Sequence, residues 1–373
     1  MAADRVLEID ASRTAMLEQL ELLVMCESPS AVPEAASECV ELFAPLAEAA
    51  FGRPSERITV DGRTHLVLPS AGATKVLIVG HLDTVWPLGT TARWPFSLDG
   101  DVVTGPGAFD MKAGLIQLLA ALRALRCSTD GLALVVTTDE EIGSPTSREL
   151  IESMARAAEA ALVFEPSAAG ALKVARKGVS LYQLEVVGRA AHAGLEPEKG
   201  ANAAIGLAHA VLALEPLART EVGTTVTPTV LSAGTTTNTV PARARADVDV
   251  RALTREEQDR VDREMRGLRA VIDGTTLTIG GGPNRPPLDQ ASSALVFAVA
   301  QRAAKDLGME DLVGVVVGGG SDGNFTAGAG TPTLDGLGAV GGNAHAEGEW
   351  VSVSAMAERA ALAARLIELL VEG

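Results

Sequence analysis

The first half of the chain alternates short, continuously apolar segments with segments of helical periodicity. The apolar runs are 75–80 (KVLIVG), 132–138 (LALVVTT) and 160–164 (AALVF), and such runs are typical of strands buried on both faces of a sheet. Helical patterns cover about 14–26, 112–126 and 146–158. This alternation predicts an α/β domain with a mostly parallel sheet flanked by helices.

The pattern changes near Lys177. Segments 179–187 and 243–251 alternate apolar and polar residues, which is typical of half-exposed antiparallel strands. Helical patterns cover about 201–218 and 254–272, and a strand is expected at 275–279. The order strand–helix–strand–strand–helix–strand is typical of a ferredoxin-like α+β unit.

Residues 280–287 are rich in Gly and Pro and mark a boundary, after which the pattern is again that of an α/β domain. The elements expected after it are a helix at about 289–307, a buried strand at 312–318, a second strand within 331–338 and a terminal helix at 354–370. We therefore predict one α/β domain, 1–176 and 285–373, interrupted by an inserted α+β domain at 177–284.

Composition narrows the class of protein. The 373 residues are 47% apolar and 21% charged, which is typical of a folded globular chain. The formal net charge of −17 argues against nucleic-acid and anionic-membrane partners. The chain has no run of about 18 apolar residues and no basic-then-apolar segment after Met1. Together with three widely spaced cysteines, this predicts a cytoplasmic protein with reduced thiols.

Candidate chemistry gathers where predicted strands end, which is where open α/β sheets place their sites. His81-Leu82-Asp83 follows the first strand, and residues two apart on a strand point to the same side. Asp83 is thus placed to orient His81 as a metal ligand. A strand-end histidine that makes one backbone hydrogen bond is an equally good interpretation of this segment alone.

The segment 105–112 (GPGAFDMK) superficially resembles a dinucleotide-binding loop. Asp110 stands where the third glycine of that loop belongs and puts a negative charge where a pyrophosphate would lie, which argues against NAD. For this segment alone, Asp110 as a helix N-cap is the alternative.

Asp139-Glu140-Glu141 follows the second strand. Adjacent carboxylates repel one another unless a cation or a proton lies between them. Because neighbouring side chains diverge, one can bind a metal while the other faces substrate. Taken by itself, the segment is better interpreted as a solvated acidic turn.

Two further candidates are Glu165, after the third strand, and His345, in a Gly-rich loop. Each alone is weak evidence. Two histidines and three carboxylates without a thiolate suit a pair of zinc-like ions. Two divalent ions carry +4, and Asp110, Glu141, Glu165 and one hydroxide supply −4.

Five segments resemble, in order and spacing, the signature of the co-catalytic zinc amidohydrolase and metallopeptidase superfamily: GHLDTV, GPGAFDMKAGL, TTDEEIGS, FEPSAAG and GGNAHAEGE. This superfamily includes acetylornithine deacetylase, succinyl-diaminopimelate desuccinylase, aminoacylase and bacterial glutamate carboxypeptidase. The chain most resembles glutamate carboxypeptidase (carboxypeptidase G type). The resemblance implies a zinc-exopeptidase-like fold whose ferredoxin-like insert serves as a dimerisation and lid domain.

The resemblance also implies roles for individual residues. The implied metal ligands are His81 and Glu165 for one ion, Glu141 and His345 for the other, and Asp110 between them. Asp83 would orient His81, Glu140 would act as general base, and the peptide bond after Asp110 would be cis.

Three residues of the insert are implied to contact substrate: His192, Asn238 and Arg251. In the family, the matching histidine often serves the partner subunit's site, and the arginine binds a substrate carboxylate. Without the resemblance, a surface-loop histidine and a strand-edge salt bridge are the simpler interpretations of His192 and Arg251.

These inferences predict a homodimeric di-zinc hydrolase, with Co²⁺ or Mn²⁺ as substitute metals. Its substrate would be a small molecule or short peptide, cleaved at an amide bond to release an amino acid with a free carboxylate. An N-acyl-amino-acid deacylase is the alternative within the superfamily. A non-catalytic binding protein on the same scaffold is the alternative from another class.

Overall fold

The computed structural model describes residues 2–372 and divides the chain into two compact units. The first unit runs up to Ala175 and also contains Leu288–Val317 and the chain from Ser321 onward. The second unit contains Arg176–Pro287 and Gly318–Gly320. Within residues 2–372, no helix is both long and apolar enough to cross a membrane.

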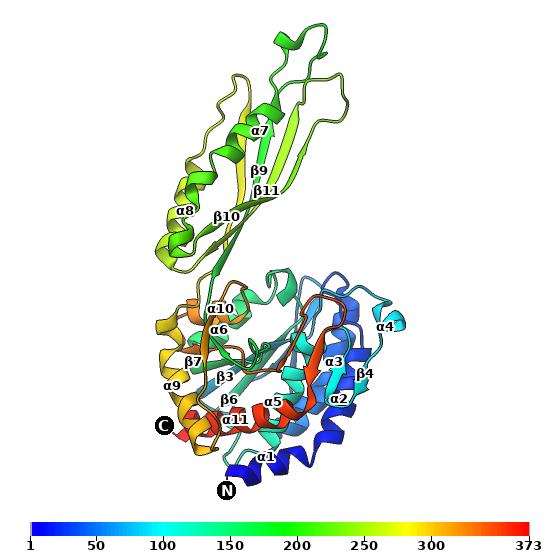
Figure 1. Cartoon of the computed structure of the whole chain (residues 1–373), viewed down its shortest axis with the longest axis vertical. Helices are drawn as coiled ribbons and strands as arrows, with labels where there is room; N and C mark the ends of the chain where they lie inside the picture. The colour runs from blue at the N-terminus through cyan, green and yellow to red at the C-terminus, as the bar shows by residue number, and fades with distance from the viewer. Residues whose placement is uncertain (1, 373) are drawn as a thin grey trace. The chain divides into compact units, whose positions relative to one another are not determined.

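The first unit is built on a six-stranded sheet with the order β1-β2-β6-β3-β7-β14. Its strands are β1 (Glu56–Val60), β2 (Arg63–Leu68), β3 (Thr74–His81), β6 (Leu132–Thr137), β7 (Ala158–Val163) and β14 (Thr333–Leu334). Strands β6, β3 and β7 are labelled in Figure 1. The four strands from β6 to β14 run parallel, and β1 and β2 form an antiparallel edge. The predicted mostly parallel sheet is confirmed.

Both faces of this sheet are covered, which explains the continuous apolar runs. On β3, Val76 and Ile78 belong to one hydrophobic cluster, and Leu77 and Val79 belong to another on the opposite face. Six α-helices contribute to the first cluster: α1 (Ala2–Asp10), α2 (Arg13–Met25), α3 (Pro33–Phe51), α5 (Ala113–Arg123), α9 (Gln290–Asp306) and α11 (Val353–Glu372). The second cluster is covered by α6 (Arg148–Arg156) and α10 (Gly323–Gly328).

A small antiparallel sheet joins two distant parts of the first unit. Its order is β15-β16-β5-β4, and its strands are β4 (Ser97–Asp99), β5 (Val102–Thr104), β15 (Gly341–Gly342) and β16 (Trp350–Ser352). Trp350 pairs with Thr104. This register places the loop before β16, with His345, beside the segment after β5, with Asp110. This unit also contains the short helix α4 (Thr90–Arg93).

The strand expected at 312–318 is present, but the expectation that it is buried is wrong. This segment forms β13 (Gly314–Val317), and its one partner strand within residues 2–372 is β8 (Leu172–Arg176), in a separate two-stranded sheet. Its residues alternate between exposed and half-buried, and 48% of Val316 is exposed. The apolar run was misleading because the strand lies outside the six-stranded sheet and has only one partner strand.

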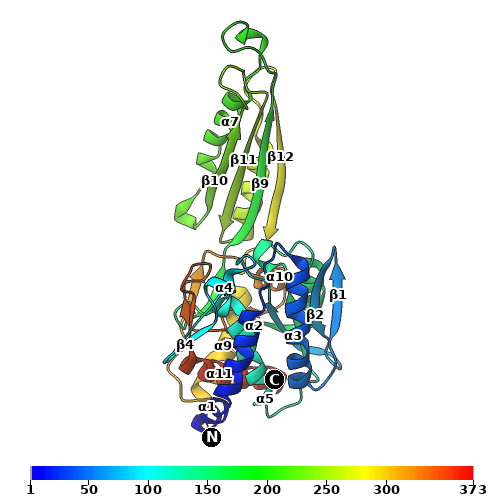
Figure 2. The same ribbon diagram turned by 90° about the vertical axis from the view of Figure 1, so that its right-hand side faces the viewer.

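The second unit is a four-stranded antiparallel sheet with the order β10-β11-β9-β12, whose strands lie side by side in Figure 2. In chain order the elements are β9 (Gly178–Val187), α7 (Ala203–Leu212), β10 (Thr225–Ala233), β11 (Arg243–Ala252), α8 (Arg255–Gly267) and β12 (Thr276–Arg285). Leu184 packs with Leu207 of α7 and Val261 of α8 in its core. The element order is the ferredoxin-like one that the sequence predicts.

One glycine sets how closely α5 approaches the sheet. A Cβ atom at Gly114 would lie 2.2 Å from the carbonyl oxygen of Phe164, which follows β7. We predict that Gly114→Ala lowers the free energy of unfolding by about 1–3 kcal/mol, the usual cost of overpacking, despite the better helix propensity of alanine. Denaturant unfolding measures this. Gly72→Ala is the control because its Cβ would meet nothing within 4 Å; equal stability of the two variants would contradict the prediction.

Candidate metal centre

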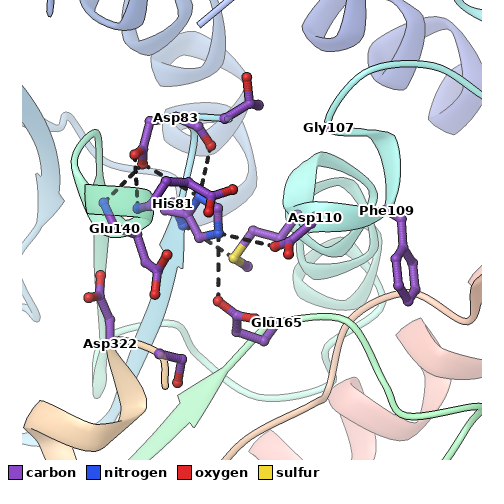
Figure 3. A network of polar contacts seen from close by, with 12 residues as sticks. His81, Asp83, Gly107, Phe109, Asp110, Glu140, Glu165 and Asp322 are labelled. Atoms are coloured by element: carbon purple, nitrogen blue, oxygen red, sulfur yellow. Dashed lines mark hydrogen bonds and ion pairs between the residues drawn. The ribbon is translucent and has the colours of Figure 1, made fainter. Parts of the chain in front are cut away.

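The ends of three parallel strands and two loops supply one cluster of polar side chains. His81 ends β3, Glu140 and Glu141 follow β6, and Glu165 lies two residues after β7. Parallel strands present their carboxyl ends at one edge of the sheet, so these side chains meet there. The turn Ala108–Lys112 adds Asp110, as Figure 3 shows, and the loop between β15 and β16 adds His345.

The cluster consists of two histidine–glutamate pairs with Asp110 between them. His81 Nε2 lies 3.3 Å from Asp110 Oδ1 and 3.6 Å from Glu165 Oε1 (Figure 3). His345 Nε2 lies 3.4 Å from Asp110 Oδ2 and 3.1 Å from Glu141 Oε2. Asp110 therefore presents one carboxylate oxygen to each histidine.

These distances fit metal ligation. Two ligands on a tetrahedral zinc ion, each about 2.0–2.1 Å from it, are about 3.3 Å apart. His81 Nε2, Asp110 Oδ1 and Glu141 Oε1 are buried and have no hydrogen-bond partner. Buried polar atoms normally have a partner, and a cation would supply one here. Nitrogen and oxygen donors suit zinc, cobalt or manganese.

The charges of the cluster are strongly coupled. Burial lowers the pKa of His81, but the nearby carboxylates, first that of Asp110, raise it well above its usual range. The carboxylates of Asp110 and Glu141 raise the pKa of half-exposed His345 to about 10. Burial raises the pKa of Asp110, but the two histidines outweigh burial and hold it below its usual range. The two imidazolium groups thus provide positive charge among the carboxylates, and two bound cations would take the place of their protons.

Asp83 connects two parts of the centre. Its main-chain oxygen lies 2.9 Å from His81 Nδ1, whereas its nearer carboxylate oxygen is 3.5 Å away. The carboxylate accepts hydrogen bonds from the Glu140 and Glu141 amides and from the Ser30 hydroxyl. The main chain of Asp83 therefore orients the imidazole, and its carboxylate fixes the turn that carries the two glutamates.

The three acidic residues after β6 point in different directions. Asp139 turns away from the cluster and accepts hydrogen bonds from Thr146 and Ser147. Glu140 is buried, and its carboxylate lies within 4.8 Å of ligand atoms of His81 and Glu165. Asp139-Glu140-Glu141 is therefore not a simple solvated turn.

The three insert residues lie in the second unit. His192 is exposed, and its Nδ1 accepts hydrogen bonds from the amides of Gly194 and Leu195. Asn238 accepts a long hydrogen bond from Thr239. Arg251 forms a bidentate ion pair with Asp249, two residues away on β11. The strand-edge salt bridge that was the simpler interpretation of Arg251 is thus present. Substrate roles for the three residues stay predictions.

Sequence reasoning missed the buried carboxylate of Glu349. It lies four residues after His345 and accepts hydrogen bonds from the turn that carries Asp110. The only sequence signal was its place inside the GGNAHAEGE motif. The implied cis peptide bond between Asp110 and Met111 is present in this turn.

Comparisons with known proteins identify the family. Residues 77–369 match the model of "Peptidase family M20/M25/M40". The chain belongs to this family. It is similar to carboxypeptidase G2 of Pseudomonas sp. (strain RS-16), with 32% identity over 79% of this chain and 74% of the relative. It is also similar to a succinyl-diaminopimelate desuccinylase of Methylorubrum populi, with 28% identity over 93% of this chain and 96% of the relative.

Among solved structures, aminopeptidase PepT of Bacillus cereus ATCC 10987 has the same fold. Its TM-score is 0.73 at 24% identity, over 99% of this chain and 98% of that one. The M20 chain is thus a metal-dependent hydrolase with a zinc-exopeptidase fold, and its relatives include both carboxypeptidases and desuccinylases.

Metal-free M20 protein should retain a protonated His345 far above neutral pH. We predict that its imidazole titrates with a midpoint near 10, because Asp110 and Glu141 stabilise the charged form. Proton–nitrogen correlation NMR of the histidine rings measures this midpoint. Glu141→Gln removes one partner and should lower the midpoint. A wild-type midpoint near the ordinary histidine value would contradict the prediction.

Proposed function

We propose that this M20 hydrolase binds two zinc ions and cleaves an amide bond to release an amino acid with a free carboxylate. His81 and Glu165 would hold one ion, Glu141 and His345 the other, and Asp110 both. The observation that carries the proposal is that the two oxygens of Asp110 face two separate histidine–glutamate pairs. Cobalt and manganese accept the same donors and are expected substitutes.

Glu140 is the proposed general base. When bound, a pair of zinc ions polarises a carbonyl group and lowers the pKa of water toward neutrality. The carboxylate of Glu140 would accept the proton from the attacking water and return it to the leaving amine. Its backbone amide is held by Asp83, and its side chain is buried beside His81 and Glu165. These contacts give the base a fixed position.

Arg251 is the proposed anchor for the carboxylate of the released amino acid. Its ion pair with Asp249 uses Nε and Nη2, which leaves the two donors of Nη1 for another acceptor. A guanidinium suits carboxylates because it binds them in a planar, bidentate geometry. Asn238 and His192 would add contacts from the same insert. Similarity to carboxypeptidase G2 supports a carboxypeptidase, and the resemblance of the sequence motifs to glutamate carboxypeptidase favours an acyl-glutamate substrate.

A deacylase of N-acyl amino acids is the second candidate, and the similarity to a desuccinylase supports it. Both candidates share the metal chemistry and differ in the acyl group that they accept. A non-catalytic binding protein is disfavoured because the five expected ligand side chains lie close together and Glu140 is buried beside them. We further propose a cytoplasmic homodimer, as family resemblance and the free cysteines favour.

A parallel assay of folyl-glutamate, N-acetyl amino acids and dipeptides with zinc- or cobalt-loaded enzyme separates these candidates. The carboxypeptidase proposal expects the highest kcat/KM with the acyl-glutamate. A preference for N-acetyl amino acids would favour the deacylase. Absence of turnover across the panel would contradict both the carboxypeptidase and the deacylase proposals.

Replacing Glu140 separates the base from the metal ligands. We predict that Glu140→Gln keeps normal metal content and loses activity by about a hundredfold or more, because an amide cannot accept the proton from water. Metal analysis and turnover measurements on the same sample test this. Retained turnover would remove Glu140 from the proposed role, and lost metal would make it a ligand instead.

The carboxylate anchor has a matched control on the same strand. Arg251→Ala should raise KM at least tenfold for substrates with a free carboxylate, because a charge-assisted hydrogen bond contributes about 1.5–3 kcal/mol. Arg245 pairs with Asp247 much as Arg251 pairs with Asp249, so Arg245→Ala removes a similar surface ion pair. Equal KM values for the two variants would show that Arg251 has no special role.

A further inference from the structure

Glu349 is a buried carboxylate with an unusual set of partners. Its side chain is fully buried. Oε1 accepts hydrogen bonds from the amides of Phe109 and Asp110, at 2.8 and 2.9 Å. Oε2 accepts from the amide of Gly107 and the indole of Trp86, both at 3.0 Å. All four partners are donors, which suits a carboxylate because both of its oxygens accept.

The amides that Glu349 binds belong to an irregular turn. Asp110 and Met111 have non-helical backbone angles, with φ −114° and ψ 96° for Asp110. The turn therefore lacks the regular ladder that satisfies amides inside a helix. Buried amides without partners are costly, so the carboxylate takes the place of the missing carbonyl acceptors. One side chain thereby sets the path of the backbone through Asp110.

Glu349 also belongs to the loop that carries His345. Its amide donates to the carbonyl of Ala346, and its carbonyl accepts from the amide of Gly105. The residue after it, Trp350, pairs with Thr104. The same residue therefore ties the His345 loop to the Asp110 turn, through both its main chain and its side chain.

We propose that Glu349 is a positioning residue that holds Asp110 with one oxygen toward each histidine–glutamate pair. The inference rests on the proposed metal centre and adds a residue that binds no metal itself. A bridging ligand has to be placed to within about 0.5 Å, and supporting hydrogen bonds supply that accuracy. Glutamine cannot replace Glu349 because its amide N–H groups would face two N–H donors at one end.

Glu349→Gln tests the proposal, with zinc affinity from chelator competition as the main measurement. We expect the affinity of the weaker site to fall about 10- to 100-fold, the usual effect of removing a partner of a metal ligand. The absorption spectrum of the cobalt-loaded protein should also change. Glu368→Gln is the matched control, because Glu368 is a buried carboxylate that accepts from Arg5 and Arg126 and touches no member of the cluster in these contacts. It should lose stability and keep zinc affinity.

Trp86→Phe supplies a second variant in case Glu349→Gln does not fold. It removes one donor to Oε2 and leaves the three amide contacts, so zinc affinity should fall several-fold. Unchanged affinity in Glu349→Gln, or in Trp86→Phe when Glu349→Gln does not fold, would overturn the inference. A fall of the same size in Glu368→Gln would also overturn it. If the wild-type chain itself binds no zinc, the proposed metal centre fails instead, so the two failures are distinguishable.

Discussion

The carboxylate of Asp110 lies between two imidazoles, and the geometry of the site depends on this contact. Its oxygens are 3.3 Å from His81 Nε2 and 3.4 Å from His345 Nε2. Such a concentration of carboxylates is stable only with positive charge among them. In the metal-free chain the two imidazolium groups provide that charge, as their raised pKa values indicate. Proton binding and metal binding are therefore alternatives at the same atoms.

The fold brings these groups together by two different means. Parallel strands β3, β6 and β7 place His81, the two glutamates after β6 and Glu165 at one sheet edge. The small sheet that pairs β5 with β16 brings in Asp110 and the His345 loop. The carboxylate of Asp83 then anchors the glutamate turn, and that of Glu349 anchors the Asp110 turn. Buried carboxylates outside the proposed ligand set thus align the ligands.

Some parts of this site could be predicted from the sequence and others could not, because only some of them depend on a recognisable residue pattern. Strands β3, β6 and β7 were predictable because burial on both faces leaves a continuous apolar run. The same signal failed at β13, where three valines form a half-exposed strand with one partner. The ligand candidates were visible as acidic and imidazole residues at strand ends. The role of Glu349 could not be predicted, because it depends on backbone amides about 240 residues away in the chain. Every residue except proline carries such an amide, so the sequence does not distinguish the ones that Glu349 binds.

The most direct test of the central claim is anomalous X-ray diffraction from zinc-loaded crystals, recorded at the zinc absorption edge. We predict two anomalous peaks, on either side of the Asp110 carboxylate. One peak should be bounded by His81 and Glu165, and the other by Glu141 and His345. A single peak, or peaks that do not involve Asp110, would contradict it.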